Sequence, residues 1–291
     1  MKNPLFTGVS TALVTPFLQG KVNYTMLEQL IGRQIEAGIR SIVLCGTTGE
    51  ASTLSDAEKA EIIYNSKQYT GASCQIIAGT GSNNTEHAVR LSCAAEEAGA
   101  DALLVVTPYY NKATPDGLYA HYSAIAQAVH IPIIVYNVPS RTGVDIPLHV
   151  YQKLAQIPKI AGVKEASSDI TKIAKIRAQC PNDFAIWSGN DDQIVPVISL
   201  GGKGVISVLS NVAPAQTLTI AQAALDGDFE TAARIQTELL PLIELLFCEV
   251  NPIPVKAAME LIGYDCGPCR LPLTPISANN LERLRKILFQ S

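Results

Sequence analysis

The chain alternates short apolar runs with longer segments of helical period, and this alternation constrains the fold more than any other feature. The runs are rich in valine and isoleucine, and the segments between them repeat apolar residues every three to four positions. The predicted strands lie within residues 8–17, 41–46, 74–81, 100–108, 131–138, 160–166, 184–190 and 204–211. The helices that follow them are expected to begin near Thr25, Ser55, Asn84, Asp116, Pro147, Ser168, Asp191 and Ala213.

Strands that are apolar on both faces, each followed by a crossover helix, imply a parallel sheet covered on both sides. Eight such units favour a closed (β/α)8 TIM barrel over an open sheet. Three further helical segments, at about 228–247, 252–262 and 277–289, follow the eighth unit without a linker. We therefore expect residues 1–226 to form a catalytic α/β barrel and residues 227–291 a C-terminal helical extension packed on it.

Charge and hydropathy exclude several classes of partner. The 22 basic and 26 acidic residues give a net charge of −4 without a basic stripe, so no nucleic acid partner is expected. The longest apolar runs, 100–108 and 239–247, are shorter than the roughly 20 residues of a membrane span. Residues 1–17 make a poor signal peptide, because hydroxyl side chains and prolines interrupt the apolar part. These features predict a cytoplasmic protein.

The cysteine pattern predicts reduced thiols rather than disulfides or a metal site. The chain has seven cysteines, an odd number, and Cys45 and Cys74 lie inside apolar segments. The "CGPC" sequence at 266–269 has redox spacing but is expected in a loop, because a proline-rich segment follows it. One such pair cannot complete a four-ligand zinc site.

A barrel places its chemistry at the carboxyl ends of the strands, and the polar residues of this chain gather there. These strand ends should converge on one mouth. The segments are "GTTGE" (46–50), "TPYYN" (107–111), "YNVPSRTG" (136–143), "IAGVKEAS" (160–167) and "SGND" (188–191).

Lys164 stands at the end of the sixth predicted strand and has two interpretations. It is either a structural lysine paired with a carboxylate other than Glu165, which points to the opposite face, or a Schiff-base nucleophile. An ordinary lysine, with a pKa of about 10.4, is neutral in only roughly one molecule in a few thousand at pH 7. An apolar strand end would lower that pKa by disfavouring the charged form.

Neighbouring strand ends supply candidate partners, each with a structural alternative. Tyr136 is either a general acid and base or a core tyrosine. The loop 46–50 either binds a small carboxylate, through backbone N–H groups and the hydroxyl of Thr47 or Thr48, or is an ordinary turn. Arg141 either binds a second carboxylate through its guanidinium or is a surface arginine.

Several segments together resemble the dihydrodipicolinate synthase branch of the class I pyruvate aldolases, in order over nearly the full chain. They are "GTTGEASTLS", "TPYYNKATPDGLYAHY", "YNVPSRTG", "GVKEAS" and "GGKGVISV". The resemblance implies a Schiff-base lysine at Lys164 and a proton-relay triad. It also implies three kinds of substrate contact: the pyruvate carboxylate, a second substrate's carboxylate and the pocket wall. The implied residues are Tyr136, Thr47 and Tyr110 for the triad, Thr48 and Arg141 for the carboxylates, and Gly189 and Ile206 for the wall.

The same resemblance implies condensation of pyruvate with L-aspartate 4-semialdehyde in lysine and diaminopimelate biosynthesis, with no metal or organic cofactor. It also implies a homotetramer, a dimer of dimers in which Tyr110 reaches the neighbouring subunit's site. Two sister activities remain alternatives, N-acetylneuraminate lyase and 2-keto-3-deoxy sugar acid aldolase, although Arg141 suits a short carboxylate better than a polyol chain. A non-enzymatic alternative is a barrel that binds a keto acid for regulation.

Overall fold

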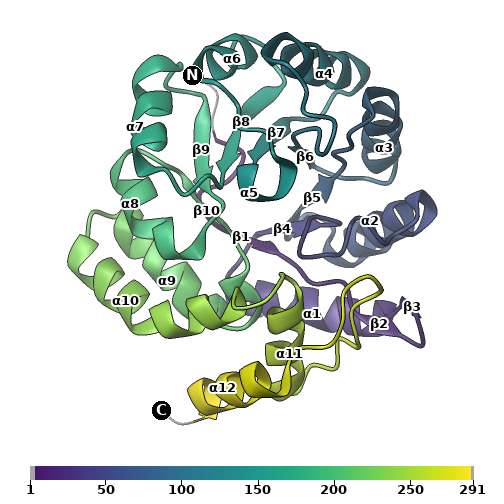
Figure 1. Ribbon diagram of the computed structural model, residues 1–291, viewed down its shortest axis with the longest axis vertical. Coiled ribbons are helices and arrows are strands. Elements are labelled where there is room, and N and C mark those ends of the chain that lie inside the picture. The colour runs from purple at the N-terminus through teal and green to yellow at the C-terminus, as the bar shows by residue number, and fades with distance from the viewer. Residues whose placement is uncertain (1–3, 290–291) are drawn as a thin grey trace.

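The structure, a computed structural model that describes residues 4–289, contains a closed barrel of eight parallel strands (Figure 1). Its strand order is β1-β10-β9-β8-β7-β6-β5-β4, which closes because β1 pairs with both β10 and β4. The predicted (β/α)8 fold and all eight predicted strands are confirmed. The strands are β1 (Gly8–Ala12), β4 (Ser41–Leu44), β5 (Gln75–Gly79), β6 (Ala102–Val106), β7 (Ile133–Asn137), β8 (Ile160–Glu165), β9 (Ala185–Ser188) and β10 (Gly204–Ser207).

The helices that surround the barrel begin within a few residues of the predicted positions. Sequence reasoning missed the hairpin β2 (Phe17–Leu18) and β3 (Lys21–Val22), and the short α5 (Pro139–Thr142) that follows β7. The other barrel helices are α1 (Tyr24–Glu36), α2 (Asp56–Thr70), α3 (Thr85–Glu97), α4 (Pro115–Ala128), α6 (Leu148–Leu154), α7 (Ile170–Gln179), α8 (Ile194–Ser199) and α9 (Pro214–Leu225). Two 3-10 turns, η1 (Asp191–Gln193) and η2 (Leu209–Asn211), precede α8 and α9.

Side-chain caps explain where several of these helices begin. The Asn23 and Asn84 side chains accept hydrogen bonds from backbone N–H groups in the first turns of α1 and α3. Helix α2 begins with a capping box, in which Ser55 and Glu58 each accept a hydrogen bond from the other's backbone N–H. The caps of α2 and α3 mark where the loops after β4 and β5 end, so they fix the lengths of these two loops.

The core has two layers, one inside the barrel and one between the strands and the helices. Strand residues are buried on both faces, as crossover helices require. The interior layer includes Ile77, Ile134 and Trp187, and Tyr136 packs against this same layer. The barrel is therefore a packed core and not an open pore.

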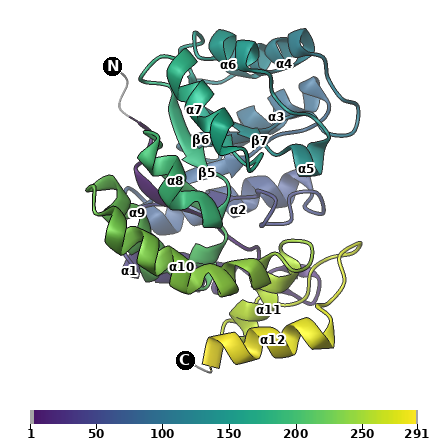
Figure 2. The ribbon, with the colours of Figure 1, turned by 60° about the vertical axis from the view of Figure 1, so that its left-hand side comes forward.

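Three helices follow the barrel: α10 (Phe229–Leu246), α11 (Ile253–Leu261) and α12 (Ala278–Phe289). Helix α10 packs on α9, and α12 packs on α10 and α11, so the three form a layer beside the barrel (Figures 1 and 2). The domain division at residue 226 stays a prediction. Within residues 4–289, no helix combines the length and the apolar character that crossing a membrane would need.

The "CGPC" segment lies outside helices and strands, as expected. Both of its cysteines are free thiols, and burial raises the pKa of the Cys266 thiol to about 12. No cluster of metal-binding side chains occurs among the described residues.

Candidate active site

Lys164 ends β8 inside the barrel mouth and is 5% exposed. Its Nζ lies 4.4 Å from the centre of the Tyr136 ring, because the two residues are paired across β7 and β8. Burial lowers the pKa of Lys164 to about 8; nearby Asp191 opposes this shift and Arg141 adds to it. Lys164 has no carboxylate ion-pair partner in residues 4–289. The structural interpretation of Lys164 as one half of an ion pair is therefore wrong.

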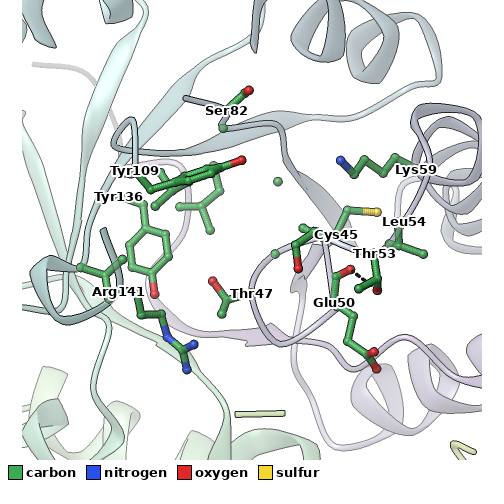
Figure 3. Close-up of a pocket in the computed structure, with 18 of the residues that line it drawn as sticks. Cys45, Thr47, Glu50, Thr53, Leu54, Lys59, Ser82, Tyr109, Tyr136 and Arg141 are labelled. Atoms are coloured by element: carbon green, nitrogen blue, oxygen red, sulfur yellow. Dashed lines mark hydrogen bonds between the residues drawn. The ribbon is translucent and has the colours of Figure 1, made fainter. Parts of the chain in front are cut away.

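Tyr136 and Thr47 place hydroxyl groups beside this amine. Burial raises the pKa of Tyr136, while the positive charge of Arg141 and a side-chain hydrogen bond with Thr47 lower it. Figure 3 shows the Tyr136 hydroxyl directed toward Thr47 and the Arg141 guanidinium. This arrangement can carry a proton between a reacting group and the hydroxyls without an external base.

Two cavities adjoin these side chains. The smaller, of about 170 Å³, is lined by Lys164, Thr48, Gly189 and other residues, and we call it the lysine cavity. The larger, of about 500 Å³, opens beside it toward α2 and α3, and we call it the side cavity. Tyr136, Thr47 and Arg141 line both cavities, and Figure 3 shows them in the side cavity.

Gly189 follows β9 and gives Lys164 the space it occupies. A Cβ on Gly189 would lie 3.1 Å from Cε of Lys164 and 2.6 Å from Cβ of Ala166. A larger side chain at this position would displace the lysine. Ile206, in contrast, is fully buried in the interior layer of the barrel and is not among the residues that line the lysine cavity.

The loop 46–50 follows β4 and is held in an unusual backbone conformation. Cys45 and Glu50, at its two ends, have φ values of 53° and 57°, in the left-handed region that non-glycine residues rarely occupy. Thr48 is 2% exposed and lines the lysine cavity. The surrounding structure must therefore stabilise this loop in the position that presents Thr48.

Arg141 lies in α5, over the barrel mouth, and its exposed side chain borders both cavities. Tyr110 is 89% exposed, has a φ of 75° and lines neither cavity. Of the eight residues predicted for the site, a single chain thus brings six to the cavities. Ile206 lies deeper, and Tyr110 is exposed outside both cavities.

Two buried carboxylates near the site went unrecognised in the sequence. Asp191 accepts hydrogen bonds from the backbone N–H groups of Val208 and Leu209, at 3.0 and 2.9 Å. Its negative charge acts to raise the pKa of Lys164, against the effect of burial. Glu165 faces the helices, where it accepts hydrogen bonds from Asn137 at 2.8 Å and Tyr151 at 2.7 Å. The "SGND" strand end pointed to Asp191, but no sequence signal pointed to the partners of Glu165.

Comparison with known proteins agrees with this geometry. The family described as "Dihydrodipicolinate synthetase family" matches residues 5–291. The chain belongs to the dihydrodipicolinate synthetase family. A 4-hydroxy-tetrahydrodipicolinate synthase of Acetivibrio thermocellus is 50% identical over 288 residues, which cover 99% of this chain and 98% of the relative.

Solved structures of family members have the same fold. The chloride-inhibited dihydrodipicolinate synthase of Acinetobacter baumannii, complexed with pyruvate, has a TM-score of 0.95 and 43% identity over 97% of this chain and 98% of its own. The enzyme of Cyanidioschyzon merolae, solved with lysine bound, has a TM-score of 0.95 and 41% identity, with 98% of both chains covered. The family resemblance and the barrel seen in the sequence are both confirmed.

Proposed function

We propose that this chain is a 4-hydroxy-tetrahydrodipicolinate synthase, which condenses pyruvate with L-aspartate 4-semialdehyde in lysine and diaminopimelate biosynthesis. The observation that carries the proposal is Lys164, a buried amine without an ion-pair partner among the described residues, whose pKa is lowered to about 8. At pH 7 about a tenth of such an amine is neutral, roughly two hundred times more than for an ordinary lysine.

The reaction follows from the groups around that amine. The Lys164 nitrogen attacks the ketone carbon of pyruvate, and loss of water gives an iminium that draws electrons from the methyl group. Loss of a methyl proton gives an enamine, whose carbon attacks the aldehyde of the second substrate. The amino group of that substrate then attacks the iminium carbon, which closes the ring and releases Lys164. Tyr136 and Thr47 move the protons, and no step requires a metal or organic cofactor.

The substrate contacts follow from position. Thr48 and its loop, with Gly189 in the cavity wall, bind the pyruvate end beside Lys164. Arg141, at the rim, binds the carboxylate of the semialdehyde. A polyol substrate, as in N-acetylneuraminate lyase or the 2-keto-3-deoxy sugar acid aldolases, would place no carboxylate there. A regulatory barrel that only binds a keto acid would not need a hydrogen-bonded tyrosine and threonine beside the lysine, so the presence of Tyr136 and Thr47 favours an enzyme.

The exposed Tyr110 supports an assembly in which each site is completed by a second chain. Tyr110 is 89% exposed and has a φ of 75°, a backbone conformation that costs free energy and is retained mainly at functional positions. We propose that it enters the neighbouring subunit's site as the third member of the proton relay, in a homotetramer built as a dimer of dimers. We also propose that the enzyme works in the cytoplasm, where both substrates are metabolites.

Product analysis tests the proposal most simply. The purified chain is incubated with pyruvate and, separately, L-aspartate 4-semialdehyde, N-acetylmannosamine and D-glyceraldehyde, and the products are identified by mass spectrometry. We expect the cyclic product with the semialdehyde only. A sugar acid product formed faster than the cyclic one would assign the chain to a sister activity, and no product in any mixture would contradict an aldolase role.

A further inference from the structure

The strongest unassigned feature of the site is a contact from the C-terminal part of the chain to Thr48. Asn251 lies between α10 and α11, and its side-chain Nδ2 donates a hydrogen bond to the Thr48 Oγ1 at 3.0 Å. The two residues are 203 positions apart in the sequence. Asn251 is 5% exposed and lines both the lysine cavity and the side cavity. The C-terminal segment is therefore part of the wall of the site.

The direction of this hydrogen bond decides what Thr48 can do. A threonine hydroxyl has one hydrogen to donate and two lone pairs that accept. Because Asn251 donates to one lone pair, the hydroxyl hydrogen of Thr48 stays free to point into the lysine cavity. No other side chain among the described residues hydrogen-bonds to this hydroxyl. A carboxylate in the cavity accepts hydrogen bonds only, so the free Thr48 hydrogen is suited to bind it.

A second contact from the same segment holds the other end of the loop. Lys256, in α11, forms a buried ion pair with Glu50 at 2.9 Å and also donates to the backbone oxygens of Thr15 and Pro268. The backbone N–H of Arg270 donates to the remaining Glu50 oxygen at 2.8 Å. Glu50 is one of the two loop residues with a positive φ. The ion pair thus stabilises the strained end of the loop, while Asn251 contacts its middle.

We propose that Asn251 is a positioning residue for pyruvate, which acts by orienting the Thr48 hydroxyl so that it donates to the substrate carboxylate. The proposal rests on the proposed function, since it assigns the carboxylate of pyruvate to Thr48. It gives the C-terminal segment a role in substrate affinity in addition to packing on the barrel.

Two substitutions separate the possible roles of Asn251. Asn251→Leu has a similar shape but no hydrogen bond, so the Thr48 hydroxyl is free to rotate. The pyruvate concentration for half-maximal adduct formation should rise about 10-fold, the usual effect of one lost hydrogen bond. Asn251→Asp can only accept, so it draws the Thr48 hydrogen away from the cavity and adds a negative charge. The rise should then be larger, about 30-fold or more, since a charged group is involved.

The measurement is borohydride trapping of the Lys164–pyruvate adduct over a series of pyruvate concentrations, with thermal unfolding of each variant. Asn280→Leu is the matched control, because Asn280 donates a 2.7 Å hydrogen bond to Glu249 in the same C-terminal region but lines neither cavity. It should leave the pyruvate requirement unchanged. The maximal trapping rate of Asn251→Leu should stay close to that of the wild type.

A double-mutant cycle with Thr48→Val tests whether Asn251 acts through Thr48. In the Thr48→Val background, Asn251→Leu should cause no further rise, because the hydroxyl that it orients is absent. Equal effects of Asn251→Leu with and without Thr48 would overturn the proposal, as would an unchanged pyruvate requirement in the single variant. If the wild type forms no adduct on Lys164, the proposed function itself fails, and the two failures are thereby distinguished.

Discussion

Two buried lysines in this chain differ in their polar and charged partners. Lys164, in β8, has an aromatic ring 4.4 Å from its amine and no ion-pair partner within residues 4–289. The Lys256 side chain is equally inaccessible, at 3% exposed, but its amine contacts the Glu50 carboxylate at 2.9 Å and two backbone oxygens. Lys256 also has an aromatic ring, that of Phe17, centred 4.5 Å from its amine. Burial and an aromatic contact are thus common to both lysines, and only their polar partners differ.

The difference shows what makes a buried lysine reactive. An ammonium without a directly paired carboxylate loses more in hydration than its remaining contacts return, so its pKa falls and the neutral amine becomes available as a nucleophile. An ammonium with a carboxylate and carbonyl partners stays charged and stabilises the structure around it. In this chain the first kind lies at the catalytic mouth, and the second holds the loop that presents Thr48.

The same substitution at the two lysines should affect activity and stability in different ways. Lys164→Met removes the nucleophile, so kcat should fall on the order of 10³-fold. Its folded-state pKa lies below the unfolded value, so at pH 7 the charged amine costs stability, and the variant should be more stable by about 1 to 3 kcal/mol. Urea unfolding at pH 7 and a coupled rate assay measure both effects. If Lys164→Met is instead less stable than the wild type, the Lys164 ammonium must have a stabilising partner, which would contradict this account.

Lys256→Met should instead destabilise the fold. It leaves the Glu50 carboxylate buried with only the Arg270 backbone N–H and the Cys269 thiol as partners, a change that typically costs about 3 kcal/mol or more. The same urea unfolding experiment measures it, and Glu50→Gln combined with Lys256→Met should recover part of the loss, because no buried charge then remains. If Lys256→Met is as stable as the wild type, the ion pair does not hold the loop.

Arg141 sharpens the comparison with a smaller effect, because burial is the main cause of the lowered Lys164 pKa and the charge of Arg141 only adds to it. Arg141→Ala removes only a minor contribution to the lowered Lys164 pKa, which burial dominates, so adduct formation with pyruvate should change little. The semialdehyde requirement should rise about 30- to 100-fold, the usual cost of losing a charge-assisted bidentate contact. Steady-state kinetics with each substrate varied in turn measures the two requirements. An equal loss for pyruvate would show that Arg141 shapes the shared site.

Much of this account could be predicted from the sequence because it depends on local patterns. Valine- and isoleucine-rich runs followed by helical segments determined all eight barrel strands, and the barrel gave Lys164 its position at the mouth. Tyr136 could be placed beside Lys164 for the same reason, since adjacent parallel strands end side by side.

The parts that could not be predicted depend on contacts between distant segments. Asn251 and Thr48 are 203 residues apart, and Lys256 and Glu50 are 206 apart, so no periodicity or motif relates them. Asn251 precedes a helix in an ordinary Asn-Pro sequence, which indicates only a turn. The partner of a buried lysine, which decides its chemistry, is likewise a property of the folded chain.

The most direct test of the central claim, that the unpaired buried lysine is the nucleophile, is borohydride reduction in the presence of pyruvate, followed by peptide mass spectrometry. We expect one modified residue, Lys164, and no modification at Lys256. The initial rate of adduct formation should rise as the pH increases through about 8, because the neutral amine attacks and its folded pKa has that value. An adduct on any other lysine, or none at any pH, would contradict the account.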